Sequence, residues 1–545
     1  MSASWAIPGC FLFVNQNRIA GILILMKTPC DEGVIRSGAR NARDNEAGLW
    51  ILAATILGSS MAFIDGTVVN VALPAIQANF HASVVDVQWV VESYGLFLAA
   101  LILAGGSLGD LFGRRRMFLA GVGIFAAASA GCGAASNIHQ LILARSIQGV
   151  GAALLVPGSL AIISSSFDEN SRGAAIGTWS GFTAITTAIG PVLGGWLVEH
   201  ASWRWVFFIN LPLAAVVIAI SLGRIPESRS QKASRLDWWG ALLATVGLGG
   251  LVGGLIESAN LGWSNSIVIG SLTVGIGCLI AFVIVEERVV SPMLPLSLFR
   301  SRTFTGANLL TLFLYAAIGI FFFLLPLNLI QVQGYSPTAA GASILPLILL
   351  MFFLSSWSGG LVARYGPRGP MIVGPLIAAV GFALFAIPSI ADSYWKSFFP
   401  AVIVLGFGMV LTVAPLTTVV MGAVDQDRAG SASGVNNAMA RLAGVLAIAV
   451  FGIVMVKAFD LRLSRDLSGL SLPVDVLHQI HADEIKLAGL QVPARLDPAV
   501  TAILKKSIAE SFVFGFRIVM LFCSGLSLIS VAVAWRTIPK EVRSS

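Results

Sequence analysis

The sequence predicts an all-α polytopic membrane protein. Hydrophobic residues make up 56% of its 545 residues and charged residues only 11%, whereas soluble domains carry about 25% charged residues. Apolar runs of roughly 20 residues recur, each long enough to cross a bilayer as a helix that satisfies its own backbone hydrogen bonds. No soluble core could hide so much apolar surface, so we expect the lipid bilayer to surround these helices.

Fourteen membrane spans are predicted from these runs. They cover residues 48–74, 87–109, 116–136, 139–163, 173–198, 203–222, 237–257, 265–285, 303–330, 338–362, 370–390, 396–420, 432–456 and 512–535. An even number of spans places both termini on the same side of the membrane.

Basic residues decide which side that is, because Lys and Arg resist translocation and mark cytoplasmic connections. They crowd one set of connections, at Arg114, Arg115 and Arg116; Arg224, Arg229, Lys232 and Arg235; Arg288, Arg300 and Arg302; Arg364 and Arg368; and Arg536, Lys540 and Arg543. The short connections on the opposite side carry only Arg204 and Lys396. We therefore expect a multi-pass protein of the cytoplasmic (inner) membrane with both termini in the cytoplasm. The net charge of +7 reflects this bias rather than a basic face for nucleic acid.

Residues with metal-binding or catalytic chemistry show no spacing typical of a site. The five cysteines, at Cys10, Cys30, Cys132, Cys278 and Cys523, lack CxxC or His-paired spacing. Neither a GxxxxGK[ST] loop nor a Ser/His/acid arrangement occurs. We expect no metal, no cofactor and no enzymatic activity, and an ion gradient as the source of energy.

Residues 1–47 precede the first span and are expected to form a cytoplasmic N-terminal segment. The apolar stretch from Gly9 to Leu25 is interrupted by Asn15, Gln16, Asn17 and Arg18, which makes it a poor signal peptide or span. Met26 begins an ordinary polar start and is a candidate for the natural first residue.

Two connections in the chain repeat one another. GSLGDLFGRRR from Gly106 lies between the second and third spans, and GGLVARYGPRG from Gly359 between the tenth and eleventh. Because the second copy follows the tenth span rather than the eighth, two helices are inserted between two six-helix halves. The expected parts are an N-terminal half at 48–222, a linker with two extra helices at 223–302, a C-terminal half at 303–535 and a cytoplasmic tail at 536–545. The long hydrophilic outer connection, 457–511, is either a small helical cap or a mobile loop.

Four motifs carry a resemblance to a known family. They are FIDGTVVNVALP from Phe63, GSLGDLFGRRR from Gly106, LILARSIQGVGAA around Arg145 and GFTAITTAIGPVLGG from Gly181. Over about residues 48–535 the chain resembles the drug/proton antiporters of the major facilitator superfamily, in the fourteen-helix branch. The resemblance implies the major facilitator fold, with a substrate site at the interface of the two halves.

The first repeated connection is a candidate gate. Its residues are Gly106, Asp110, Gly113, Arg114 and Arg115. Gly106 and Gly109 let helices approach, Gly113 permits a tight turn, and Asp110 can accept hydrogen bonds from helix-end amides. The resemblance implies that Asp110 and its basic partner Arg114 latch the cytoplasmic gate. A turn with topology-setting arginines is the alternative.

Arg145 lies within the fourth span, where a guanidinium is costly unless it faces a cavity or a partner. The resemblance assigns such an arginine to proton coupling, with Gln148, Gly149 and Gly151 beside it. The alternative is a structural arginine paired with helix-end carbonyls.

The fifth span carries a candidate hinge, the antiporter motif of the resembled family. Its residues are Gly181, Gly190, Pro191, Gly194 and Gly195. Gly177 with Gly181, and Gly190 with Gly194, place small residues four apart, which permits close helix packing. Pro191 frees a backbone carbonyl and bends the helix.

WRWVFFINLP from Trp203 and RLDWWG from Arg235 also resemble the fourteen-helix branch. Tryptophans at the start of a span are equally typical of interfacial anchors. Both interpretations stay open for Trp203 and Trp205.

Two acids and one arginine are predicted at similar depth in the outer half of the N-terminal domain: Asp65, Glu92 and Arg145. Burial and a nearby guanidinium act on a carboxyl in opposite directions, so together they can hold an acid ready to exchange a proton. We expect Asp65 to be the main proton site, with Glu92 supplementing it and Arg145 tuning both. Glu92 departs from the family pattern, which more often has a small polar residue there. An interfacial acid that reaches outer water is the other interpretation of Glu92.

Polar and aromatic residues elsewhere are candidates for the substrate cavity. They are Asn70, Tyr94, Gln148, Asn308, Asn328, Asn436, Asn437 and Arg441. The C-terminal half is poor in intramembrane acids, and its run Phe321–Phe323 is more typical of lipid or core contact than of ligand binding.

The leading hypothesis is a proton-coupled secondary antiporter that exports amphipathic, potentially cationic drugs, with the small-molecule substrate, protons and lipid as its partners. The alternatives are a dedicated exporter of one metabolite or siderophore and, from another class, a membrane sensor that does not transport. The sequence does not indicate whether a periplasmic adaptor takes part.

Overall fold

The computed structural model describes residues 38–540, except 168, 230–236, 290–291, 425–428, 469–471, 474–475, 478, 481–483, 491 and 493–495. The chain divides into two units, residues 1–47 and residues 48–545, and the helical bundle belongs to the second. The candidate start at Met26, the cysteines Cys10 and Cys30, and Arg235 lie outside the described residues.

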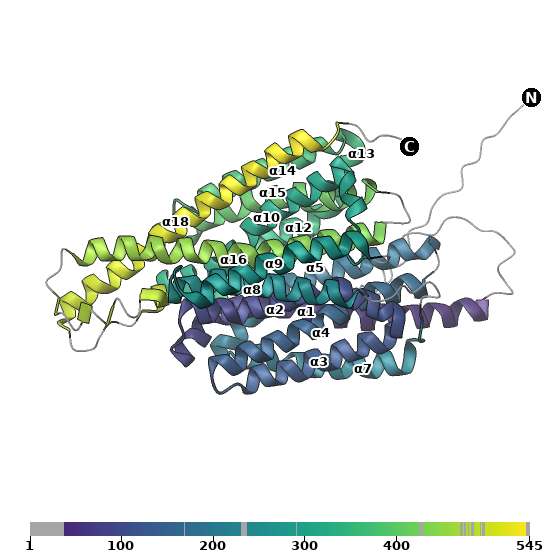
Figure 1. Ribbon diagram of the computed structural model, residues 1–545, viewed down its shortest axis with the longest axis horizontal. Helices are drawn as coiled ribbons and strands as arrows, with labels where there is room; N and C mark the ends of the chain where they lie inside the picture. Colours follow the sequence, from purple (N-terminus) through teal and green to yellow (C-terminus); the bar gives the residue numbers. More distant parts are fainter. Residues whose placement is uncertain are drawn as a thin grey trace, which may run out of the picture. The chain divides into compact units, whose positions relative to one another are not determined.

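Helices make up the described chain, which contains no strand. They are α1 (Gly38–Phe80), α2 (Val84–Phe112), α3 (Arg114–Ala134), α4 (Ile138–Ser166), α5 (Glu169–His200), α6 (Trp205–Phe208), α7 (Asn210–Arg224), α8 (Trp238–Leu261), α9 (Ser266–Arg288), α10 (Arg302–Leu327), α11 (Pro337–Ala342), α12 (Leu345–Gly359), α13 (Leu361–Tyr365), α14 (Arg368–Leu384), α15 (Tyr394–Gly422), α16 (Ala429–Leu467) and α18 (Pro498–Thr537), with short turns η3 (Leu296–Arg300), η4 (Asn328–Val332) and η6 (Glu484–Gly489). Most of these helices run roughly side by side along the bundle (Figure 1).

The all-α membrane fold predicted from the sequence is confirmed. Among the described residues, 12 helices are long and apolar enough to cross a membrane. α5, with 32 residues, and α14, with 17, occupy the positions predicted for the fifth and eleventh spans. The exact count of fourteen spans stays a prediction.

Capping side chains set where several spans begin. At α2 the Ser83 hydroxyl accepts a hydrogen bond from the amide of Asp86, and the Asp86 carboxylate accepts one from the amide of Ser83. Asn137 and Asp237 cap α4 and α8 through single side-chain acceptors. These bonds satisfy amides that the first helical turn leaves without partners, so the apolar stretch that follows can enter lipid.

The two halves meet along two seams. α2 packs against α16, and α5 packs against α11 and α12. The inserted helices pair with each other, and α8 also contacts α2 and α16. On α2, Trp89 donates its indole N–H to Glu257 of α8 at 2.7 Å, so the inserted pair is fastened beside the first seam.

The halves touch most closely at one end of the bundle, the end of Phe80 and His200. We name it the outer end, after the orientation expected from the charge distribution. Gln331 donates to Gln77 at 2.8 Å, and the amide of Thr338 donates to Glu199 at 3.2 Å. The hydrogen bonds found between the halves among the described residues all lie toward this end. In the described part of the chain, hydrogen bonds therefore join the two halves at the outer end.

The helices beside the long outer connection extend further than predicted. α16 continues to Leu467 rather than ending at 456, and α18 begins at Pro498 rather than at 512. Arg462 on α16 lies 3.8 Å from Glu510 on α18, and η6 packs against both helices. The described part of this connection therefore resembles a small helical cap rather than a loop.

Candidate functional site

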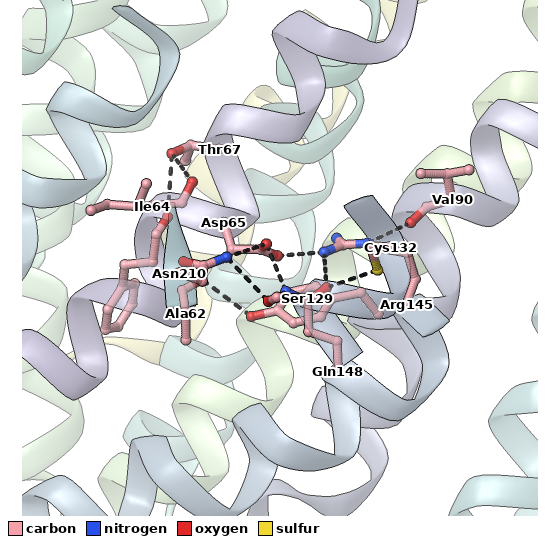
Figure 2. Close-up of polar contacts among 12 residues, drawn as sticks. Ala62, Ile64, Asp65, Thr67, Val90, Ser129, Cys132, Arg145, Gln148 and Asn210 are labelled. Carbon is pink, nitrogen blue, oxygen red and sulfur yellow. Dashed lines mark hydrogen bonds and ion pairs between the residues drawn. The ribbon is translucent and has the colours of Figure 1, made fainter. Parts of the chain in front are cut away.

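A buried ion pair joins α1 to α4 in the N-terminal half. The Arg145 guanidinium donates to the carboxylate of Asp65, and the side chains are 1% and 0% exposed. Figure 2 shows the two groups facing each other inside the bundle. Removing one member of such a pair leaves an uncompensated charge in a low-dielectric interior, at a cost of about 3–5 kcal/mol.

Neutral side chains complete the hydrogen bonds of this pair. Gln148 donates its amide to Asp65 at 2.8 Å and accepts from Arg145 at 2.7 Å. Asn210 of α7 donates to Asp65 at 3.3 Å, and its amide also lies 3.3 Å from the hydroxyl of Ser129 on α3. Side chains of four helices, α1, α3, α4 and α7, therefore form one hydrogen-bond network around the Asp65 carboxylate (Figure 2).

Arg145 has further partners outside the acid. Its Nε donates to the carbonyl of Val90 at 3.0 Å, and its guanidinium lies 4.3 Å from the centre of the Tyr94 ring. The structural alternative, an arginine paired only with carbonyls, is therefore incomplete, because the guanidinium binds both a carbonyl and an acid. Loss of the acid's charge would leave Arg145 with other partners.

Two glycines allow α4 to lie close enough for these contacts. A side chain at Gly149 would collide with the carbonyl of Tyr94 on α2, and one at Gly151 would collide with the backbone of Phe125 on α3. Small residues at helix contacts permit this approach in membranes.

Glu92 forms no ion pair or hydrogen bond with Asp65 or Arg145 among the described residues, and its expected part in proton coupling stays a prediction. Its side chain is 1% exposed, and neither carboxylate oxygen has a hydrogen-bond partner. One helical turn to either side, Gln88 faces α16 and Leu96 belongs to an apolar cluster with α8 and α16. Residues four apart share a helix face, so Glu92 faces the seam with those helices. Its burial also contradicts an acid that reaches outer water.

The gate motif forms the predicted tight turn. Gly113 has φ +111°, and its amide donates to the carbonyl of Gly109 before α3 begins at Arg114. Arg114 donates to Asp110 through Nε and a terminal nitrogen, at 2.9 and 2.8 Å. The close approach of α2 to α4 occurs at Gly105, beside the carbonyl of Ala153, rather than at Gly106 or Gly109.

A different acid caps the helix that follows the gate turn. The amides of Arg115 and Arg116 donate to Glu227 at 3.1 and 3.2 Å, whereas the sequence predicted Asp110 for this role. Glu227 lies after α7, more than a hundred residues along the chain. Among the described residues, the Asp110 side chain therefore accepts hydrogen bonds from Arg114 only.

The two repeated connections have matching structures. Gly366 has φ +73° and, like Gly113, precedes a helix. Arg115 donates to the carbonyl of Ile225 at 2.9 Å, and Arg368 donates to the carbonyl of Trp535 at 2.5 Å. In each half, the equivalent arginine ties the connection to the end of the half's last helix.

The hinge motif connects α5 to both halves. Gly190 and Gly194 lie against α1, where added side chains would meet Thr67 and Val68. Pro191 cannot donate to the carbonyl of Thr187, and the hydroxyl of Thr67 donates to that carbonyl at 3.3 Å. The freed carbonyl expected from the sequence therefore has a partner on α1.

The same helix contacts the opposite half. Gly195 lies against the backbone of Pro337, and Gly341 of α11 lies against the carbonyl of Pro191. Gly177, expected to pack closely, has nothing within 4 Å and lines the cavity instead. The surroundings of Gly181 lie outside the described residues.

A cavity of about 720 Å³ lies between the halves. Its wall includes Thr67 and Asn70 of α1, Pro191 of α5, Tyr315 of α10 and Met351 of α12. Asp65 is not part of the wall. Two and five residues separate it from Thr67 and Asn70, which places these side chains on other faces of α1.

Most of the other cavity candidates serve packing. Asn436 donates to Asn308 at 3.2 Å and to Thr311 at 2.7 Å, which fastens α16 to α10. Asn328 accepts from Gln333 at 3.3 Å, and Asn437 donates to the backbone of its own helix. Arg441 lies 5.7 Å from the ring centre of Phe63 across the halves. None of these side chains lines the cavity.

Sequence reasoning missed Asn210, Ser129, Glu227 and Thr67. An available signal for Asn210 and Ser129 was a polar side chain within an apolar span, a position that is costly without a partner. Of the two tryptophans left open, Trp203 is 6% exposed and packs in the core, whereas Trp205 is 53% exposed, as an interfacial anchor would be.

Comparison with known proteins places this geometry in a family. The Major Facilitator Superfamily family model matches residues 55–448. The chain is 35% identical over 523 residues to the multidrug resistance protein Stp of Mycobacterium tuberculosis (strain CDC 1551 / Oshkosh), covering 92% of this chain and 94% of that protein. It is 32% identical over 488 residues to the tetracenomycin C resistance and export protein of Streptomyces glaucescens, covering 89% and 90%.

Solved structures agree on the fold. A bacterial homologue of the human lysosomal transporter Spinster, in its inward-facing and occupied conformation, aligns with a TM-score of 0.61 at 19% identity, over 90% of this chain and 97% of that one. The family match, the relatives and the paired helical halves agree, and the chain belongs to the Major Facilitator Superfamily.

Proposed function

We propose that this membrane transporter is a proton-coupled antiporter that exports drugs or other toxic small molecules from the cytoplasm. The observation that carries the proposal is the Asp65–Arg145 pair, buried in an apolar bundle on a helix that also forms the cavity wall. Relatives named for multidrug resistance and for tetracenomycin C resistance and export support the direction of transport.

Proton binding at Asp65 starts the conformational change. In the inward-facing state the carboxylate is ionised and held by Arg145, Gln148 and Asn210. In the outward-facing state, a proton arriving from outside converts it to a neutral acid, which removes the charge attraction between α1 and α4. Arg145 keeps the carbonyl of Val90 and the Tyr94 ring, so the protonated state is accessible.

α1 transmits that change to the cavity. It carries Asp65 on one face and Thr67 and Asn70 on others, and Thr67 is hydrogen-bonded to the hinge carbonyl of Thr187. A shift of α1 therefore moves the cavity wall and the hinge of α5 together. Proton and cargo need not share a binding site for their movements to be coupled.

The remaining roles follow from position. Asp110 and Arg114 latch the cytoplasmic gate when that side closes. The basic connections support cytoplasmic termini and a bundle in the cytoplasmic membrane. Glu92 is assigned no part in this cycle.

The test is drug accumulation in proteoliposomes under an imposed pH gradient. Asp65→Asn keeps the hydrogen-bonding shape but cannot ionise, so we expect proton-driven accumulation to fall to background while facilitated exchange persists. Glu92→Gln is the matched control, since it neutralises the other intramembrane acid of the N-terminal half and should leave accumulation near the wild-type level. Uphill transport by Asp65→Asn would refute the proposal.

A further inference from the structure

The cavity carries no charge among its described residues. Of the side chains that line it, five are polar but uncharged: Thr67, Asn70, Thr187, Tyr315 and Ser355. The others are apolar or aromatic, with Phe322 and Phe352 among them. An ion that entered this space would lose hydration with no opposite charge to replace it, which is costly in a low-dielectric interior.

Three of the five polar groups are already engaged with backbone carbonyls. The single hydroxyl proton of Thr67 is shared between the carbonyls of Ile64, at 3.0 Å, and Thr187, at 3.3 Å. Thr187 donates to the carbonyl of Thr183 at 2.7 Å, and Ser355 to that of Phe352 at 3.2 Å. Asn70 and Tyr315 make no side-chain hydrogen bond within the described part of the chain. They come from opposite halves, α1 and α10, and are the wall's available donors and acceptors.

The buried charged side chains of the bundle lie outside the cavity wall. The charge of Asp65 is compensated by Arg145 on another face of α1, and Glu92 faces the seam with α8 and α16. Arg441, over the ring of Phe63, forms no ion pair among the described residues.

We propose that the cargo crosses as an uncharged molecule, an inference that rests on the proposed function. It is largely apolar and aromatic, and it carries carbonyl or hydroxyl oxygens that hydrogen-bond to Asn70 and Tyr315. This narrows the amphipathic, potentially cationic cargo expected from the sequence. Exchange of a neutral molecule for protons moves positive charge inward, so the membrane potential drives export as well as the pH gradient.

Binding to purified protein tests the charge preference independently of transport. The probes are several neutral aromatic ketones and amides, each paired with a quaternary-ammonium derivative of similar size, and binding is followed by tryptophan fluorescence. We expect each neutral probe to bind at least tenfold more tightly than its cation. Cations that bind as tightly as their neutral partners, or a failure of all the neutral probes to bind, would overturn the inference.

Variants locate the site in the same experiment. Asn70→Ala and Tyr315→Phe each remove one hydrogen bond and should weaken binding of the neutral probes about fivefold. Asn70→Asp places a carboxylate in the wall and should improve binding of the cations. Unchanged neutral affinity in both truncation variants would contradict the assignment of these two residues.

Transport separates this inference from the function on which it rests. In everted vesicles at equal pH, a lumen-positive potential set with potassium and valinomycin should drive the tightest neutral probe into the lumen, but not its cation. Accumulation that responds to a pH gradient but not to the potential would refute the inference that the cargo is uncharged, and would leave the proposed antiport intact. Accumulation under neither the pH gradient nor the potential would refute the proposed antiport as well.

Discussion

Asp65 and Arg145 illustrate how one residue's meaning depends on its neighbours. Each alone would be an expensive charge within the bilayer, and together they form a compensated pair with Gln148 and Asn210. Sequence analysis could identify Asp65, Arg145 and Gln148, because charges and amides within apolar spans are conspicuous. It could not place Glu92 correctly, because residues at similar depth on different helices can face opposite ways.

The pair should behave as a unit in stability measurements. Arg145→Leu and Asp65→Leu each leave one buried charge uncompensated, and each should destabilise the protein by about 3–5 kcal/mol. The double variant leaves neither charge, so its thermal midpoint in detergent should exceed those of both single variants. Additive losses in the double variant would show that the two side chains act separately.

Removal of the Glu92 carboxyl should raise the stability of the protein, in contrast to the loss expected at Asp65 and Arg145. It is buried without a partner, one helical turn from Leu96, which belongs to an apolar cluster with α8 and α16. Glu92→Leu removes an unsatisfied carboxyl from an apolar cluster, and we expect a gain of about 1 kcal/mol in stability. Differential scanning fluorimetry in detergent measures the shift. A loss of stability would mean that the carboxyl has a partner that its present surroundings do not reveal.

At the scale of the helices, positions were predictable and contacts were not. Apolar runs and flanking arginines give the spans, and GxxxG-like spacing correctly marks Gly190 and Gly194 as contact residues. The same spacing wrongly suggested a contact at Gly177, because which face of a helix meets a neighbour depends on packing angles. Helix ends outside the lipid, at Leu467 and Pro498, carry no hydropathy signal and were also missed.

The contact between α5 and α11 should decide whether the outer side can close. Gly195→Val would collide with the backbone of Pro337, so we expect the outward-facing state to be favoured and export to fall at least tenfold. Spin-label distances between the outer ends of α5 and α11 report the population. Gly177→Ala is the matched control on the same helix, since nothing lies within 4 Å of that position; an equal loss of export there would argue for a general effect on α5.

At the scale of the whole molecule, the structure shows one state of a cycle. The outer ends are joined by Gln77, Gln331 and Glu199. The side chains of the gate residues Asp110 and Arg114 bond only to each other within the described part of the chain. The repeat could be predicted from the sequence, because the two connections align in register. The state could not, since a single sequence encodes both ends of the cycle.

The latch should matter only when the cytoplasmic side closes. We expect Asp110 to gain a partner across the halves when the gate closes, so Asp110→Asn should raise the population of the inward-facing state at the expense of the outward-facing one. Maximal export rate should fall about tenfold, whereas the affinity of the inward-facing state for cargo should remain near that of the wild type. A loss of affinity with an unchanged maximal rate would place Asp110 in cargo binding instead.

Proton release on cargo binding tests the central claim most directly. Purified protein in weakly buffered solution is mixed with saturating cargo, and a pH indicator dye records the protons released. Cargo binding favours the inward-facing state in which Asp65 is ionised, so the wild-type protein should release protons, and Asp65→Asn should bind the same cargo and release none. Equal release by the two proteins, or binding without release by the wild type, would contradict a mechanism in which Asp65 couples the proton to the cargo.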